Sequence, residues 1–258
     1  GPADLVFTGT FLWWGGSFSG SGKTVITTNA TLTAKTTNSK WIERPVDNYG
    51  VATFADNMTV YVRNSIWDNK PGSVMNFPKG GAYNWAGGSP LLVNSGAINK
   101  AGTNSLSLYY VPLNNNAALN ITEGKVSLDG GTNTGSIQIN TNATLELASS
   151  TFVLRTNTAF TGSGNFRIIS SAILGLETDV DLGTLRVFFD SIYPPQGSFA
   201  MANSPGGSIS FNRALTVPNS FLIGGALATT ATNIVLTING DLVLENGSVV
   251  DNPGSIRV

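Results

Sequence analysis

The sequence predicts an all-β chain wound as a parallel β-helix, a solenoid in which each coil stacks on the one before it. Three observations support this fold: short runs alternate apolar with polar residues, glycine and asparagine punctuate them, and similar phrases recur about every twenty residues. Alternation places one set of side chains on one face of a strand. No window keeps apolar residues at helical spacing over a useful length, so we expect strands throughout.

The first coil sets the pattern. Residues 6–34 read VFTGTFLWWGGSFSGSGKTVITTNATLTA, with pauses at Gly15-Gly16 and Gly20-Ser21-Gly22, where the backbone must turn. We therefore expect strand, bend, strand, bend, strand within about thirty residues. Further strands are expected at Val60–Val62, Leu106–Tyr110, Lys125–Leu128, Thr144–Leu147, Phe166–Ile169, Leu185–Phe189, Ser208–Phe211, Ile234–Ile238 and Asp241–Leu244.

Internal repeats support stacked coils. FLWWGGS at 11–17 returns as YNWAGGS at 83–89, and GSGKTVI at 20–26 returns as GSGNFRI at 162–168. TNATLT at 28–33 returns as TNATLE at 141–146. A β-sandwich is the alternative, because regularly spaced short strands also fit it. The glycine corners that recur with the strand phrases favour the β-helix.

Composition narrows the class of protein. The chain has 258 residues, of which 41% are hydrophobic and only 11% charged, with a formal net charge of -1. This profile is typical of turn-rich, often extracellular β proteins, and the lack of a basic block argues against nucleic acid as a partner. There is no cysteine and no histidine, so disulfides, thiolate chemistry and the commonest general base and metal ligand are excluded.

Several phrases point to a known family. FLWWGGSFSGSGKTVI, TNATLTA, DNYGVATF, NSGAINKAG and NAALNITEGKVSLDGG, within residues 6–170, resemble the right-handed β-helix repeats of large bacterial surface adhesins of the filamentous-haemagglutinin and autotransporter types. The resemblance implies a right-handed coil and a secreted or surface-anchored rod for display, attachment or self-association. It carries no shared catalytic residues.

The pattern divides the chain. Residues 3–187 are expected to form β-helix coils, and 188–207, which contain Pro194-Pro195, an irregular loop excursion, since proline cannot donate to a ladder. Residues 208–258 are expected to be terminal coils or a small β cap. Gly1-Pro2 is interpreted as a scar of tag removal, and the chain as part of a longer protein. The longest uncharged run, 214–240, contains a proline and two adjacent glycines and makes a poor membrane span.

Five tryptophans lie in the first third of the chain. Alternation places Trp13 inward and Leu12 and Trp14 outward, and the repeat match predicts that Trp85 is buried like Trp13. Trp14, Trp41 and Trp67 are candidate contacts for a glycan or a protein partner, because aromatic rings offer broad contact area at low entropy cost. The alternative is that they pack under loops or cap the solenoid.

One acidic set is a candidate for chemistry. Glu177, Asp179 and Asp181 alternate along one expected strand face, where they could hold calcium or act as paired carboxylates on a sugar bond. Like charges two residues apart also fit a solvated outer face, which is the interpretation we prefer. We therefore assign no catalytic, cofactor or metal-binding residue.

Together these observations predict a non-enzymatic extracellular module, the stalk or binding tip of a larger adhesin at the cell surface or secreted. Its expected partner is a glycan or a cell-surface protein, with no nucleic acid, no membrane span in this segment and no cofactor. The alternative is a polysaccharide-degrading β-helix enzyme, a hydrolase or a lyase, which needs acidic residues from neighbouring coils in one groove. A purely mechanical spacer is a third hypothesis.

Overall fold

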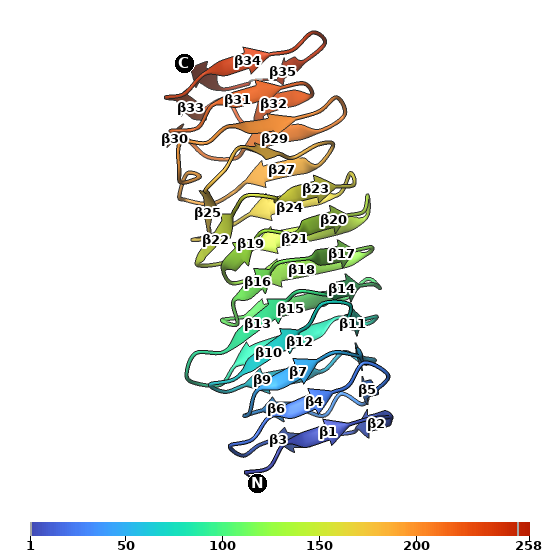
Figure 1. Ribbon diagram of the computed structural model, residues 1–258. Coiled ribbons are helices and arrows are strands. Elements are labelled where there is room, and N and C mark those ends of the chain that lie inside the picture. Colours follow the sequence, from blue (N-terminus) through green and yellow to red (C-terminus); the bar gives the residue numbers. More distant parts are fainter. Residues whose placement is uncertain (1, 252) are drawn as a thin grey trace.

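The computed structural model describes residues 2–251 and 253–258, so Gly1 of the expected tag scar lies outside the described residues. The chain forms a rod, a β-solenoid of about 12 turns that rises from the N-terminus to the C-terminus (Figure 1). Its sheets are all parallel, which confirms the predicted β-helix class and excludes the β-sandwich, whose sheets are antiparallel. The described part of the chain is without helix, and thus without any helical segment suited to crossing a membrane.

Each regular turn contributes one strand to each of three sheets. Sheet A contains β1 (Leu5–Phe7), β4 (Thr24–Ile26), β7 (Val46–Asn48), β10 (Ile66–Asn69), β13 (Leu91–Asn94), β16 (Leu113–Asn115), β19 (Gly131–Asn133), β22 (Thr151–Leu154) and β25 (Ile173–Leu176). Sheet B contains β2 (Thr10–Trp13), β5 (Thr31–Ala34), β8 (Val51–Phe54), β11 (Val74–Phe77), β14 (Ala97–Lys100), β17 (Ala118–Ile121), β20 (Ser136–Ile139) and β23 (Ala159–Thr161).

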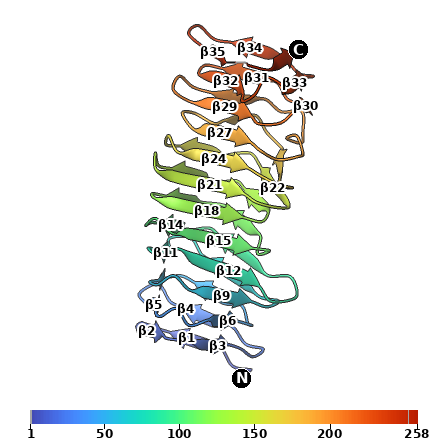
Figure 2. The same cartoon turned by 180° about the vertical axis from the view of Figure 1, so that it is seen from behind.

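Sheet C is the longest sheet and runs up one side of the rod (Figure 2). It contains β3 (Gly16–Phe18), β6 (Lys40–Ile42), β9 (Thr59–Val62), β12 (Gly81–Trp85), β15 (Ser105–Tyr109), β18 (Gly124–Leu128), β21 (Ala143–Leu147), β24 (Asn165–Ile168), β27 (Arg186–Phe189), β29 (Ser208–Phe211), β32 (Ala226–Thr229) and β35 (Val249–Asp251).

Two shorter sheets complete the upper turns. Sheet D contains β26 (Val180–Asp181), β28 (Met201–Asn203), β31 (Phe221–Ile223) and β34 (Leu242–Leu244), and sheet E contains β30 (Leu215–Val217), β33 (Val235–Ile238) and β36 (Ser255–Arg257). The nine strands expected beyond the first coil coincide with strands of the structure to within one residue at either end.

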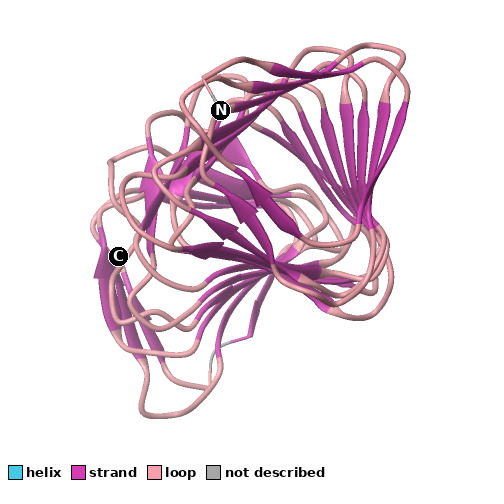
Figure 3. Ribbon diagram, turned by 90° about the horizontal axis from the view of Figure 1, so that it is seen from below, coloured by secondary structure: helices cyan, strands magenta, loops and turns pink. Residues whose placement is uncertain are grey.

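The sheets surround the interior of the rod, as the view along it shows (Figure 3), and a column of inward side chains forms the core. Alternation generates it: in β8 and β11 every second residue is buried. Parallel pairing then sets like residues above one another, so Phe54 stacks on Phe77 at 4.9 Å and Phe189 on Phe211 at 4.8 Å between ring centroids. Each fully buried side chain of this size contributes roughly 1.5–3 kcal/mol.

A file of buried asparagines interrupts this apolar column, and we call it the inner ladder. It consists of Asn48, Asn69, Asn94, Asn115 and Asn133, the last residues of five consecutive sheet A strands. All five are fully buried. Each Nδ2 donates to the Oδ1 of the next asparagine, at 2.7, 2.8, 2.6 and 2.6 Å in chain order. The same nitrogens also donate to backbone carbonyls, those of the first residues of β11, β14 and β17 for Asn48, Asn69 and Asn94, and those of the corner residues Ala117 and Gly135 for Asn115 and Asn133.

Both ends of the inner ladder are closed by local partners. Asn48 Oδ1 accepts a hydrogen bond from the Gly50 N–H at 3.2 Å, and Asn133 Nδ2 donates to Thr158 Oγ1 at 3.0 Å. Burying an amide without partners costs several kcal/mol, whereas a fully bonded row carries no such cost. The ladder therefore fixes the register of sheet A at the corner where the chain bends into sheet B.

A second file of asparagines lies on the outer face of sheet B, and we call it the outer ladder. Asn76, Asn99 and Asn120 occupy matching positions on β11, β14 and β17. Asn99 donates to Asn76 at 3.0 Å, and Asn120 donates to Asn99 at 2.9 Å. All three are half-buried.

Sheets A and B are both interrupted in the upper part of the rod, whereas sheet C is continuous. Within the predicted excursion 188–207, residues 188–189 belong to β27 and 201–203 to β28, so the stretch without strands is 190–200. It contains Pro194-Pro195 and joins sheet A only through an isolated bridge between Gly175 and Gln196. Asn219 ties the stretch down, donating to the Gly197 and Phe199 carbonyls at 2.8 and 3.0 Å.

Candidate ligand-binding face on sheet C

The three tryptophans predicted as contacts lie in different environments. Trp14 is 56% exposed at the corner before β3, and Trp41 is half-buried on the outer face of β6. Trp67 is only 1% exposed, so its assignment to a binding surface is wrong. The neighbouring Asp68-Asn69 suggested a turn, but both belong to β10, and the register aligns Trp67 with the inward Val46.

Trp13 is buried as predicted, with 3% exposure, but Trp85 is not. Trp85 is 50% exposed, and its indole Nε1 donates to the Gly88 carbonyl at 2.9 Å across a tight corner. Trp13 ends β2 of sheet B, whereas Trp85 ends β12 of sheet C. The repeated phrase thus marks a strand followed by a corner, and it does not fix which face of the strand carries the tryptophan.

Exposed or half-exposed aromatic residues lie within or at the carboxyl ends of four consecutive sheet C strands. This aromatic stripe consists of Trp41, Tyr61, Trp85, Tyr109 and Tyr110. Its members come from β6, β9, β12 and β15, so each turn supplies at least one ring. Scattered exposed aromatics need no explanation, but a contiguous row on a soluble surface is typical of an interaction site.

The lower part of the stripe is ordered by its own contacts. Trp41 and Tyr61 stack with ring centroids 4.6 Å apart, and the Arg63 guanidinium lies 5.1 Å from the Trp41 ring centroid. Arg63 is fixed in turn, because it donates to Glu43 Oε1 at 2.9 Å and to the Ala86 carbonyl at 3.1 Å. These contacts hold the rings in place before any ligand arrives, which lowers the entropy cost of binding.

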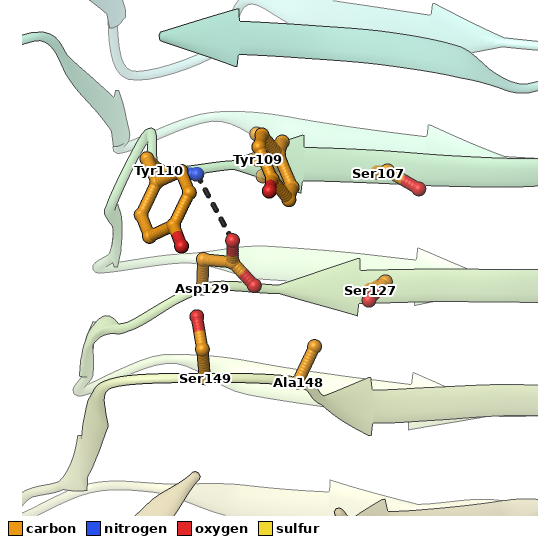
Figure 4. A pocket seen from close by; sticks show the side chains of 8 residues that line it. Ser107, Tyr109, Tyr110, Ser127, Asp129, Ala148 and Ser149 are labelled. Atoms are coloured by element: carbon orange, nitrogen blue, oxygen red, sulfur yellow. Dashed lines mark hydrogen bonds between the residues drawn. The ribbon is translucent and has the colours of Figure 1, made fainter. Parts of the chain in front are cut away.

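At its upper end the stripe meets a small pocket of about 260 Å³ (Figure 4). Its side chains include Ser107, Tyr109, Tyr110, Ser127, Asp129 and Ser149. The rings of Tyr109 and Tyr110 meet edge to face at 4.5 Å. A hydrogen bond with the Tyr110 side chain is the main cause that raises the pKa of Tyr109 above its ordinary value of 10.0.

Beyond the pocket, sheet C carries a charged groove of about 490 Å³. Glu146, only 8% exposed, accepts a hydrogen bond from Lys125 Nζ at 2.7 Å. One turn higher, Arg167 binds Asp190 through Nη2 at 2.6 Å and Nε at 3.2 Å. Asn212 also donates to Asp190. Each carboxylate is therefore paired with a cation from a neighbouring turn.

The acidic set noted in the sequence does not form a site. Glu177, Asp179 and Asp181 are all exposed, and each has its own local partner. Glu177 pairs with Arg155 at 3.0 Å, while Asp179 and Asp181 each accept a backbone N–H at 2.8 Å. Across the described residues, there is no group of three or more acidic side chains placed to hold a metal ion.

Sequence reasoning missed the two tyrosines at the pocket and the groove residues. Lys125, Glu146 and Arg167 are separated by about a coil each along the chain, and only the register of β18, β21 and β24 brings them together. Compared with models of protein families, with curated protein sequences and with solved structures, the chain gives no match.

Proposed function

We propose that this chain is a non-enzymatic, extracellular β-solenoid module of a larger surface protein, and that it binds a glycan along the outer face of sheet C. The observation that carries the proposal is the aromatic stripe, with one or two rings on each of four consecutive turns. Secretion or display at the cell surface is supported by the low charge and by the resemblance of the repeats to surface adhesins.

The geometry of the stripe suits a linear, repeating ligand. Successive turns of a parallel sheet lie about 4.8 Å apart, so the outward column of Trp41, Tyr61, Asn84 and Tyr109 offers contacts at a regular interval. A sugar ring presents C–H faces and a rim of hydroxyl groups, which matches rigid aromatic side chains that have one apolar body and a polar tip. Asn84, between Tyr61 and Tyr109 in the same outward column, adds an amide for hydroxyl contacts.

The test is binding to a glycan array and to insoluble polysaccharides, with Trp41→Ala and Tyr109→Ala as the variants. The matched control is Tyr193→Ala, since Tyr193 is 43% exposed but lies in the strandless stretch 190–200, away from the stripe. We expect both stripe variants to lose at least tenfold in affinity, in line with truncation of a central aromatic anchor, and the control to bind normally. Equal effects of all three, or no glycan bound by the wild type, would overturn the proposal.

The charged groove favours a second candidate function, a polysaccharide-active enzyme. Glu146 is a nearly buried carboxylate between turns that also carry Lys125 and Arg167, and acid chemistry on glycosidic bonds uses a carboxylate pair roughly 5 to 9.5 Å apart. The same polysaccharide incubations, followed by chromatography of the supernatants, decide between the two. If the wild type releases new oligosaccharides and the Glu146→Gln variant does not, the chain is an enzyme and the non-enzymatic assignment is wrong.

A further inference from the structure

The pocket at the upper end of the aromatic stripe continues the stripe's own column of side chains. Tyr109 in β15 is in register with Asn84 of the turn below. Asp129 directly follows the last residue of β18. The backbone pairing of sheet C extends past the strand ends, since the Ala148 N–H donates to the Leu128 carbonyl at 3.0 Å. A ligand lying along the stripe therefore reaches this pocket without changing direction.

Asp129 is a buried carboxylate without a cation. It is 6% exposed, and within the described part of the chain it forms no ion pair. Its only hydrogen bond there comes from the Tyr110 N–H to Oδ2, at 3.1 Å (Figure 4). Glu146, on the next turn and similarly buried, has Lys125 as its partner. A buried charge without such compensation costs several kcal/mol, which a donor arriving from outside offsets.

Ser149, at the same pocket, carries a second buried polar group. Its Oγ is fully buried, and among the described residues it has no hydrogen-bond partner. Figure 4 shows the hydroxyl on the side of Ser149 that faces Asp129. A hydroxyl can donate and accept, whereas a carboxylate only accepts. Because the Ser149 hydroxyl has no accessible surface, the selection of a ligand falls to Asp129, which favours one that donates a hydrogen bond.

We propose that this pocket binds a neutral sugar ring, with one hydroxyl donating to Asp129 and the ring resting against Tyr109 and Tyr110. The inference rests on the proposed glycan function and adds the class of sugar. The uncompensated charge of Asp129 repels uronic acids and sulfated sugars. A volume of about 260 Å³ is below the roughly 300–1,000 Å³ of pockets for drug-sized ligands, so it suits a single ring.

Calcium is a poor alternative for this pocket, because it takes six to eight oxygen ligands, usually including several carboxylates. Asp129 is the one carboxylate among the residues that line the pocket in the described structure. An ammonium group would also meet a carboxylate beside tyrosine rings, and the test below separates it from a neutral ring.

The experiment is saturation-transfer NMR on the full chain with the methyl glycosides of glucose, galactose and mannose, and with glucuronic acid and glucosamine. The variant is Asp129→Asn, which keeps the shape of the side chain, with Asp181→Asn as the exposed control. We expect a neutral glycoside to bind the wild type and the control alike. Asp129→Asn should weaken it about tenfold, since a hydrogen bond to a charged acceptor is worth more than one to an amide.

Three results would overturn the inference: no neutral glycoside bound, unchanged binding in Asp129→Asn, or glucosamine or glucuronic acid as the preferred ligand. The retention of insoluble polysaccharide and its loss in Trp41→Ala are measured in parallel. If polysaccharide binds through the stripe but no monosaccharide enters the pocket, this inference fails alone. If neither binds, the proposed function fails as well.

Discussion

The inner and outer ladders make the same amide-to-amide bond between consecutive turns, at 2.6–2.8 Å inside sheet A and 2.9–3.0 Å outside sheet B. They differ in what surrounds them. An amide on the outside can exchange a lost partner for water, whereas a buried one cannot. The same residue at the same spacing therefore stabilises the fold where it is buried and contributes little to stability where it is exposed to water.

The additional bonds of the inner ladder follow from this difference. Each buried Nδ2 also donates to a backbone carbonyl, such as that of Ala118 at the start of β17 for Asn94, at 2.9 Å. In the outer ladder, Asn99 makes only its two amide contacts within the described structure, with Asn76 and from Asn120. The side chains of the inner ladder therefore donate to backbone carbonyls as well as to one another. Asn99 of the outer ladder makes no such backbone contact in the described structure.

The largest effect is expected from Asn94→Leu, in the middle of the inner ladder. The substitution keeps the number of side-chain heavy atoms, but it leaves Asn115 Oδ1 without a donor in the core and Asn69 Nδ2 with only the Ala97 carbonyl, at 3.2 Å. We expect a loss of about 3 kcal/mol in the free energy of unfolding, measured by equilibrium denaturation in urea. A loss below about 1 kcal/mol would show that the core tolerates broken amide bonds, and the contrast between the ladders would collapse.

Lys100→Met tests whether a different buried polar group behaves like the inner ladder. Lys100 is fully buried in a column that otherwise holds Phe77 and Ile121, and burial lowers its pKa below 10.5. Its Nζ donates to the Ala101, Gly102 and Glu123 carbonyls at 2.7, 2.6 and 3.1 Å. Methionine fills the space without a donor, so we expect a loss of about 2 kcal/mol in the same denaturation assay. Stabilisation instead would mean that removing the buried charge outweighs the three lost bonds.

A pH-dependent contribution to stability is expected from Asp47, which pairs with two lysines on the outer face of sheet A. Burial alone would raise the pKa of Asp47, but hydrogen bonds from Lys23 and Lys70 and their charges outweigh it and lower that pKa below 3.8. The stabilisation is therefore fully present above about pH 4 and is lost as the pH falls through the folded-state pKa. Melting temperatures of wild type and Asp47→Asn should differ at pH 6 and converge toward about pH 2. A difference that stays constant with pH would assign the effect of this substitution to packing.

The smallest effect is expected from Asn99→Leu, the matched partner of Asn94→Leu. Both residues belong to the same turn, one at the end of β13 and one within β14. Asn99 is half-exposed, so water replaces its lost contacts, and we expect a change within about 0.5 kcal/mol. A loss as large as that of Asn94→Leu would mean that turn-to-turn amide bonding, and not burial, carries the stability.

The fold was predictable because its signals are periodic and local. Alternation placed Trp13 inward and Leu12 and Trp14 outward, as the structure confirms. The inner ladder was also within reach, since its asparagines recur 18 to 25 residues apart, each shortly before the next strand. From the sequence alone, asparagine was interpreted as punctuation between strands, because asparagine is a common turn residue.

The site was much harder to predict, because it depends on register between coils. Trp67 was misplaced since a strand residue beside Asp68-Asn69 looks like a turn residue. The pocket joins Tyr109, Asp129 and Ser149 from three strand ends about twenty residues apart, and a shift of one residue in any corner would separate them. Nothing in a single strand announces that Asp129 has no cation beside it.

The continuity of sheet C has a mechanical consequence. Beside residues 190–200, one wall of the rod has no strand and is held by the Gly175–Gln196 bridge and by single hydrogen bonds such as those of Asn219, while sheet C crosses the same level with its backbone pairing intact. Under a bending load the weak wall opens first, and sheet C acts as the hinge line of the deformation. Distances along a hinge line change least when a beam flexes. Contacts spaced along sheet C thus keep their interval while the rest of the rod yields.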